Sequence, residues 1–202
     1  MRVPWTCMGD AMFIDYETLK IMSEAGCIGM KFGVESANPD ILAAINKPLN
    51  LDKVKEVVKW CRGLGIRTHA TFCLGLPGET VDSIKRSIAF MEELDVDTAQ
   101  VSKVVPYPGT PMYDWAVKNN YLTTTDLDKF DSAGNSIINY PGLSNLKLDD
   151  LYQKFSKKVA RKKVLRYFKE PRQSLSIILE IWRRKGFISI VRSLWTFFQR
   201  AF

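Results

Sequence analysis

Cysteine and histidine are scarce in this sequence, and their scarcity excludes several classes of protein. The 202 residues contain four cysteines and one histidine. The cysteines, Cys7, Cys27, Cys61 and Cys73, lie 20, 34 and 12 residues apart, so they form neither a CxxC pair nor a metal-knuckle pattern. The chain is therefore not a disulfide scaffold, and we expect reduced thiols in a cytoplasmic protein.

Long apolar runs are also missing. The most apolar stretches near the C-terminus, 175–182 and 187–198, are interrupted by Glu180 and Arg192. Both are far shorter than the roughly 20 residues that span a bilayer. The first 13 residues lack the apolar core of a signal peptide. The absence of Walker A and GxGxxG loops counts against an unrelated nucleotide-binding α/β enzyme.

Positive charge is concentrated near the C-terminus. The chain has a net charge of +7, but residues 1–146 hold 14 basic and 18 acidic side chains, whereas residues 147–202 hold 15 basic and 4 acidic ones. This asymmetry predicts an anionic membrane surface or an acidic protein face as the partner of 147–202. A solvated helix face is the alternative interpretation, and we expect no nucleic-acid partner.

Residues 1–120 alternate between strand and helix patterns. Such alternation predicts parallel strands joined by helical crossovers, and therefore an α/β fold. About four βα units fit in this length, which is half of a (β/α)8 barrel of about 250 residues. The prediction is either an open sheet or a partial TIM-like barrel. The expected strands are 3–8, 27–34, 66–76 and 96–105.

The remaining sequence is predicted to contain no strands. Residues 121–146 are rich in Asn, Thr, Asp, Gly and Pro and predict an irregular linker. Residues 147–202 show three amphipathic helical patterns, the first with a basic face. We therefore divide the chain into a partial barrel (1–120), a linker (121–146) and a basic helical tail (147–202).

Ligands of parallel α/β folds bind where the strands end, so the candidate residues are those that follow the strands. Glu35 and Ser36 follow the second strand, Gly75–Thr80 the third and Pro106–Pro111 the fourth. A tight turn and a helix start are the alternative explanation for Gly75–Thr80. Glu35 is harder to explain structurally, because a buried acid needs a partner. His69 lies within a strand and is predicted to be a structural histidine.

The motifs at these strand ends occur in a familiar order. The segments 32–36 (FGVES), 72–80 (FCLGLPGET) and 106–110 (PYPGT) resemble the later strands of radical S-adenosylmethionine (SAM) enzymes, most closely the class with a cobalamin-binding domain. The resemblance covers residues 3 to about 120. The stretches 5–7 and 24–27 are similar to the region that leads into this family's fourth strand, and the tail resembles the family's C-terminal ends more loosely.

The resemblance implies cofactors and roles. Family members bind a [4Fe–4S] cluster on a CxxxCxxC loop, and the cluster reduces SAM to a 5′-deoxyadenosyl radical. By resemblance, Glu35 and Ser36 contact the ribose or amino-acid part of SAM, and the segment Leu74, Gly75 and Leu76 runs past the adenine. A final pair, Tyr107 and Pro108, closes the adenine side. Cobalamin is a further cofactor that the class implies.

The sequence departs from the family in one respect: it contains no CxxxCxxC, so no metal ligand is assigned. Three thiolates must converge on one cluster, and the spacing of Cys7 and Cys27 does not supply them. We therefore expect the C-terminal portion of a radical SAM enzyme, inactive alone or dependent on a chain that supplies the first half of the barrel and the cluster. The alternative is a non-catalytic scaffold whose basic tail docks on a membrane, peripheral to its inner face, or on an acidic partner.

Overall fold

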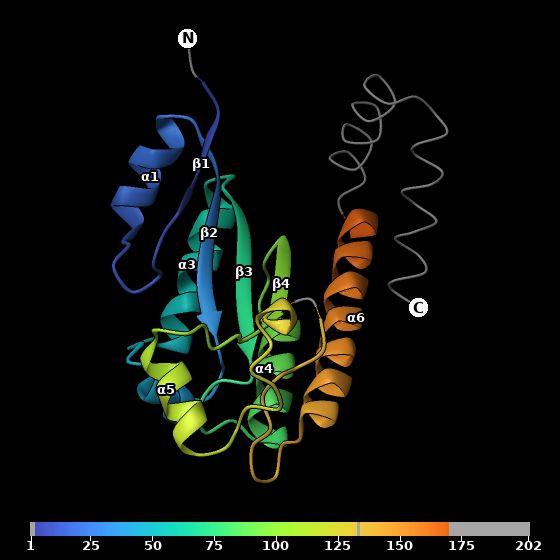
Figure 1. Ribbon diagram of the computed structural model, residues 1–202. Helices are drawn as coiled ribbons and strands as arrows, with labels where there is room; N and C mark the ends of the chain where they lie inside the picture. The colour runs from blue at the N-terminus through green and yellow to red at the C-terminus, as the bar shows by residue number, and fades with distance from the viewer. Residues whose placement is uncertain (1–2, 133, 170–202) are drawn as a thin grey trace.

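A computed structural model describes residues 3–132 and 134–169 (Figure 1). Four parallel strands form one sheet in the order β1-β2-β3-β4, and the helices alternate with them. This confirms the α/β fold with four parallel strands. The strands are β1 (Trp5–Met8), β2 (Cys27–Glu35), β3 (Arg67–Leu74) and β4 (Thr98–Lys103). The helices are α1 (Tyr16–Glu24), α2 (Pro39–Ala44), α3 (Leu51–Gly63), α4 (Val81–Glu93), α5 (Pro111–Lys118), the short 3₁₀ helix η1 (Leu127–Lys129) and α6 (Asn145–Lys169).

The helices begin where short polar side chains can cap them. The Asp15 carboxylate accepts the Thr18 N–H at 2.7 Å at the start of α1, and Asn50 accepts two N–H groups at the start of α3. Thr80 and Ser83 form a reciprocal capping box at α4. Each cap satisfies N–H groups that have no partner within their helix, so these caps fix where the crossovers end.

The sheet is covered by helices on one face. Phe32, Val34, Phe72 and Leu74 are buried at alternate positions of β2 and β3, and α3 and α4 lie behind the strands in Figure 1. Side chains of the intervening positions, such as His69, point to the opposite face because successive strand residues alternate. They are only half-buried. The sheet therefore has a packed face and an open, polar face.

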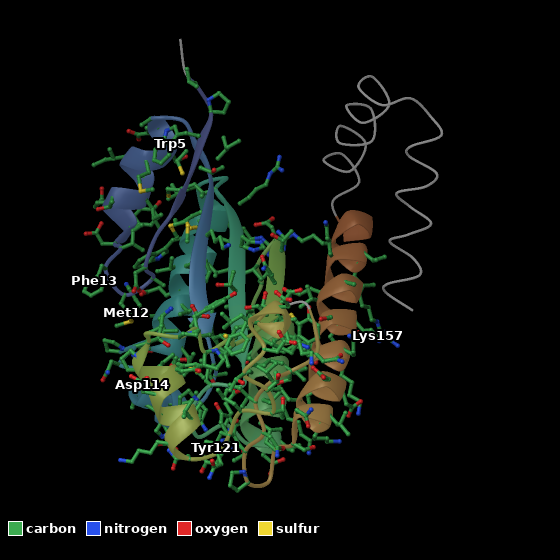
Figure 2. All side chains as sticks on the ribbon, in the orientation of Figure 1. Trp5, Met12, Phe13, Asp114, Tyr121 and Lys157 are labelled. Atoms are coloured by element: carbon green, nitrogen blue, oxygen red, sulfur yellow. The ribbon has the colours of Figure 1, made fainter. Side chains whose placement is uncertain are left out.

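The edge of the sheet at β1 is exposed. Met8 and Phe13 have exposed fractions of 79% and 87%, and Phe13 projects from the segment between β1 and α1 (Figure 2). An exposed strand edge with apolar side chains is a surface to which another chain can pair.

Helix α6 packs on the body of the molecule instead of extending away from it. Leu148, Leu151 and Phe155 are buried, and the Phe155 ring lies 5.2 Å from that of Phe72 on β3. The first part of the predicted tail thus completes the core beside β4 and α4. The two apolar patterns at 175–182 and 187–198 lie outside the described residues. In the described part of the chain, no helix is long and apolar enough to cross a membrane.

The segment between α5 and α6 has little regular structure in its described residues, but it is packed. Ile137, Ile138, Tyr140 and Leu143 are buried in the core. Its isolated β-bridges pair Leu122 with Ile138 and Tyr140 with Leu143. This segment therefore works as part of the fold as well as a connection.

A buried ion pair fastens this segment and α6 to the sheet. Lys103, at the end of β4, is 5% exposed, and its ammonium lies 2.5 Å from the Asp149 carboxylate. It also donates to the Gly134 carbonyl. Asp149 in turn accepts the Ser136 N–H at 3.0 Å. One pair of charges thus joins a strand, a loop and a helix.

The turn after β3 is organised by a buried carboxyl group. Glu79 is 3% exposed, and its Oε2 accepts the N–H groups of Gly75 at 2.6 Å and Leu76 at 3.2 Å. Within the described structure, its Oε1 has no hydrogen-bond partner. Burial raises the pKa of Glu79 to about 7, although the two N–H groups oppose the shift.

The Lys103–Asp149 pair predicts a large difference between single and double substitutions. Lys103→Met leaves the Asp149 carboxylate, which is 22% exposed, without its ammonium partner, so we expect it to lower the free energy of unfolding by about 1.5–3 kcal/mol. Lys154→Met, which breaks the exposed pair with Asp150, should lower it much less. Urea unfolding of the full chain measures both. A double substitution, Lys103→Met with Asp149→Leu, should recover much of the loss; equal losses in all three variants would contradict this account.

The raised pKa of Glu79 predicts a pH-dependent stability. The folded state holds the proton more tightly than an unfolded glutamate does, so this group makes unfolding easier as pH rises from about 4.5 to about 7. The difference between the pKa of Glu79 in the folded state and in the unfolded state corresponds to about 3 kcal/mol of stability. Glu79→Gln removes this ionisation, so the variant should gain stability relative to the parent between pH 4.5 and pH 8. Denaturant titrations at several pH values test this, and parallel curves for the two proteins would contradict it.

Candidate functional site

The carboxyl ends of β2 and β3 lie side by side and carry most of the predicted site residues. Glu35, the last residue of β2, pairs in register with Phe72 of β3. Leu74 ends β3, and Gly75 and Leu76 follow it. The structure thus brings Glu35 and the 74–76 segment to one edge of the sheet, as the sequence predicted.

Glu35 combines an unusual backbone with an ion pair. Its φ of 62° lies in the left-handed region, which costs a residue with a side chain of this size about 1–3 kcal/mol and is most common at functional sites. Its carboxylate lies 3.1 Å from the Lys47 ammonium, and the two side chains are 28% and 25% exposed. A ligand at the strand ends can therefore reach a carboxylate and an ammonium together.

Gly33 makes room for this pair. A Cβ at Gly33 would collide with the Glu35 carboxylate and would lie 2.7 Å from the Lys47 Nζ. A larger residue at this point of β2 would therefore displace the ends of the Glu35 and Lys47 side chains. Lys47 follows α2, so the pair is formed between a strand end and the end of the next helix.

Ser36 has its partners inside the protein. The side chain is fully buried, and its hydroxyl lies 3.4 Å from that of Ser87 on α4. It also accepts the Asn38 N–H at 3.3 Å. Ser36 thus supports the loop that carries Glu35, and a direct contact of its side chain with a ligand stays a prediction.

The 74–76 segment presents backbone rather than side chains. Gly75 has a φ of +86°, and a Cβ there would lie 2.9 Å from Leu148 Cδ2 and 3.0 Å from Val104 Cγ1. Its carbonyl accepts the Tyr140 hydroxyl at 2.8 Å. Glycine is therefore required both by the turn and by close packing. Leu74 and Leu76 are buried on either side of it.

Tyr107 and Pro108 lie in the exposed loop after β4. The Tyr107 side chain is 54% exposed, and its hydroxyl donates to the Phe130 carbonyl at 3.1 Å. The loop is thus tied to the segment between α5 and α6. The predicted role of these two residues at the adenine side stays a prediction.

The open face of the sheet adds a row of polar groups below the strand ends. Lys31 and His69 are paired in register, and His69 is paired with Thr98. His69 Nδ1 lies 2.7 Å from the Thr98 hydroxyl, which fits the structural histidine that the sequence predicted. Burial, followed by the charge of Lys31, lowers the pKa of His69, so its ring is neutral at pH 7.

The cysteines do not fit an iron–sulfur cluster. A cluster needs several thiolates that converge on one site. Within residues 3–132 and 134–169, no group of three or more Cys, His, Asp or Glu residues could hold a metal ion. The described residues therefore do not fit an iron–sulfur cluster.

One residue of this site and the role of another could not be predicted from the sequence. Lys47 follows a helix end and belongs to no motif, so nothing in the sequence pointed to its contact with Glu35. Glu79 lies within the candidate segment 75–80, but no role was assigned to it. Its position four residues after Gly75, in a turn with free N–H groups, was the available signal for its role as their acceptor.

Comparison with known proteins identifies a matching family model and several similar proteins. Residues 5–91 match the family model described as the radical SAM superfamily. An uncharacterised methyltransferase of Pyrococcus horikoshii is 29% identical over 93% of this chain and 38% of its own length. The cytidylyl-2-hydroxyethylphosphonate methyltransferase of Streptomyces wedmorensis is 29% identical over 70% of this chain and 28% of its own. The chain thus spans well under half of either relative.

The fold has a solved counterpart. The radical SAM methyltransferase TsrM of Kitasatospora setae, whose structure contains cobalamin and a [4Fe–4S] cluster, superimposes with a TM-score of 0.52 at 22% identity, over 58% of this chain and 24% of that one. This likeness shows the fold, a TIM-like arrangement of parallel strands. The family match over residues 5–91, from β1 into α4, makes this part of the chain similar to the radical SAM superfamily.

Proposed function

We propose that this chain forms the part of a radical SAM methyltransferase that holds the amino-acid and ribose end of SAM. The observation that carries the proposal is the Glu35–Lys47 pair, 3.1 Å apart at the carboxyl edge of the sheet. The amino-acid part of SAM bears one ammonium and one carboxylate group. A site with one carboxylate and one ammonium is complementary to it, so the residues fit this cofactor.

The adjoining backbone suits the other end of SAM. Leu74–Leu76 offers a glycine and apolar neighbours at the end of the next strand, where a planar base can approach the main chain without meeting a Cβ. Gly75 cannot shift freely, because Glu79 holds its N–H and Tyr140 holds its carbonyl. The chain therefore provides a rigid edge against which the cofactor can be oriented.

Methyl transfer is the reaction class that the relatives support. Both curated relatives described above are named methyltransferases, and TsrM, a methyltransferase, contains cobalamin as well as a cluster. In this family, SAM bound to a reduced cluster supplies a 5′-deoxyadenosyl radical. Here the cluster would be held by cysteines that this sequence does not contain, in a partner chain or another part of the protein, and cobalamin would be bound outside this sequence as well.

The open sheet face is the proposed substrate side. Lys31, His69 and Thr98 line a depression of about 460 Å³ near the first residues of β3 and β4. His69 is engaged by Thr98, so the charged groups available in the depression are those of Lys31, Arg67 and Asp97. Such a face favours a substrate with polar or anionic groups over an entirely apolar one.

Removing either charge at the strand ends should weaken SAM binding. Each charge-assisted hydrogen bond is worth about 1.5–3 kcal/mol, so Glu35→Gln and Lys47→Met should each weaken binding about tenfold or more. Lys53→Met, which removes the partner of the exposed Glu56, is the matched control and should change affinity less than about twofold. Isothermal titration of SAM into the full chain measures all of them.

An exchanged pair separates ligand binding from support of the fold. Glu35→Lys combined with Lys47→Glu restores an internal ion pair but reverses the positions of the two charges. We expect this variant to keep its unfolding midpoint and to lose SAM binding. If the parent binds no SAM at millimolar concentration, or if Glu35→Gln binds as well as the parent, the proposal is wrong and the non-catalytic scaffold becomes the better explanation.

A further inference from the structure

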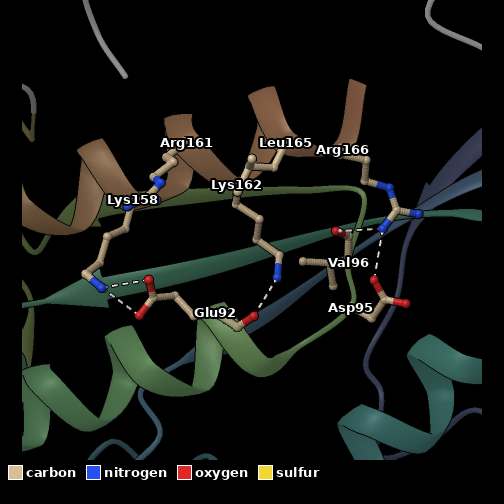
Figure 3. Close-up of a pocket in the computed structure, with 8 residues that line it drawn as sticks. All are labelled: Glu92, Asp95, Val96, Lys158, Arg161, Lys162, Leu165 and Arg166. Carbon is tan, nitrogen blue, oxygen red and sulfur yellow. Dashed lines mark hydrogen bonds and ion pairs between the residues drawn. The ribbon is translucent and has the colours of Figure 1, made fainter. Parts of the chain in front are cut away.

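A second pocket lies far from the strand ends, between α4 and α6. It has a volume of about 360 Å³, and its walls come from the end of α4, the segment before β4 and one face of α6 (Figure 3). Val96, which lines it, lies two residues before β4, whereas the candidate SAM site follows the strands. The lining residues are Glu92, Asp95, Val96, Lys158, Arg161, Lys162, Leu165 and Arg166.

The pocket has an excess of positive charge. Four of the lining residues are basic and two are acidic. The basic ones occur at helical spacing along α6, so they project from one face toward the pocket. A cavity lined by charge of mainly one sign concentrates ions of the opposite sign.

The acidic groups already have partners. Both oxygens of the Glu92 carboxylate lie within 2.7 Å of the Lys158 ammonium, and the Asp95 carboxylate accepts a hydrogen bond from Arg166 at 3.1 Å. Lys162 donates to the Glu92 backbone carbonyl at 2.9 Å. Each ion pair is close to neutral, so Glu92 with Lys158, like Asp95 with Arg166, adds little net charge to the pocket.

Among the basic residues of the pocket, Arg161 takes part in none of these contacts. In the described part of the chain, no ion pair or hydrogen bond involves its guanidinium, although the side chain lines the pocket. It lies one turn from Lys158 and next to Lys162 in the sequence. A guanidinium presents parallel N–H groups that match two oxygens of a phosphate group.

We propose that this pocket binds a phosphate group, as a phosphomonoester or a diphosphate, with Arg161 as the main contact and Lys158 and Lys162 beside it. The shared chemistry of the ligand is a dianionic phosphate group, carried either by a small soluble molecule or by a lipid headgroup. The apolar side chains of Val96 and Leu165 leave room for the carbon skeleton that carries the phosphate. The site is independent of the proposed SAM site.

Inorganic pyrophosphate is the probe for the soluble source. Titrated into the full chain at low salt, it should bind with an affinity that falls as salt is added. Arg161→Ala should weaken binding about tenfold or more, the loss expected for one charge-assisted contact. Lys157→Ala removes the same charge from the outward side of α6 (Figure 2) and should change the affinity less than about twofold. Neither substitution should change SAM affinity or the unfolding midpoint.

Vesicles test the lipid source with the same three proteins. Binding to phosphatidylcholine vesicles that contain about 20% phosphatidic acid is compared with binding to vesicles of phosphatidylcholine alone. Binding only to the first, lost in Arg161→Ala and retained in Lys157→Ala, would assign the phosphate to a lipid headgroup. The proposal is overturned if the parent binds neither probe, or if both substitutions weaken binding equally, since a diffuse basic surface would then account for it.

Discussion

The buried contact between Lys103 and Asp149 is the interaction on which the arrangement of the C-terminal half depends. It joins the last strand to α6, and through Gly134 and Ser136 it also fixes the loop between α5 and α6. A pair of this kind is costly to desolvate and tolerable only when its remaining hydrogen bonds are made. Because the loop supplies those bonds, strand, loop and helix must assemble together, and the Tyr140 contact with Gly75 follows from that assembly.

The features that could be predicted from the sequence are those that local patterns of residues determine. Strand patterns between helical patterns located all four strands, and short polar residues, Asp15, Asn50 and Thr80, cap three of the helices. The position of Glu35 at a strand end made it a site candidate before any geometry was known. These features depend on residues a few positions apart, so they can be predicted from short stretches of the sequence.

Contacts between distant segments could not be predicted in this way. The pairing of Glu35 with Lys47 depends on how α2 returns to the sheet, and the use of the basic face of α6 depends on where α4 ends. Composition made the 147–202 segment look like a separate tail, whereas Lys158 and Arg166 reach acidic groups of the body. The part after residue 169 stays a prediction, as do the division into three segments and any attachment to a membrane.

The order of the strands has a consequence for how the chain is made. Because the sheet order β1-β2-β3-β4 is the order of synthesis, each strand that leaves the ribosome can pair with one that is already present. Folding can therefore advance in the direction of translation. Helix α6, which covers β4 and α4, follows all four strands of the described structure. A nascent chain that stops before α6 would expose the Phe72 surface that Phe155 covers, and exposed apolar surface of this kind makes incomplete chains prone to aggregate.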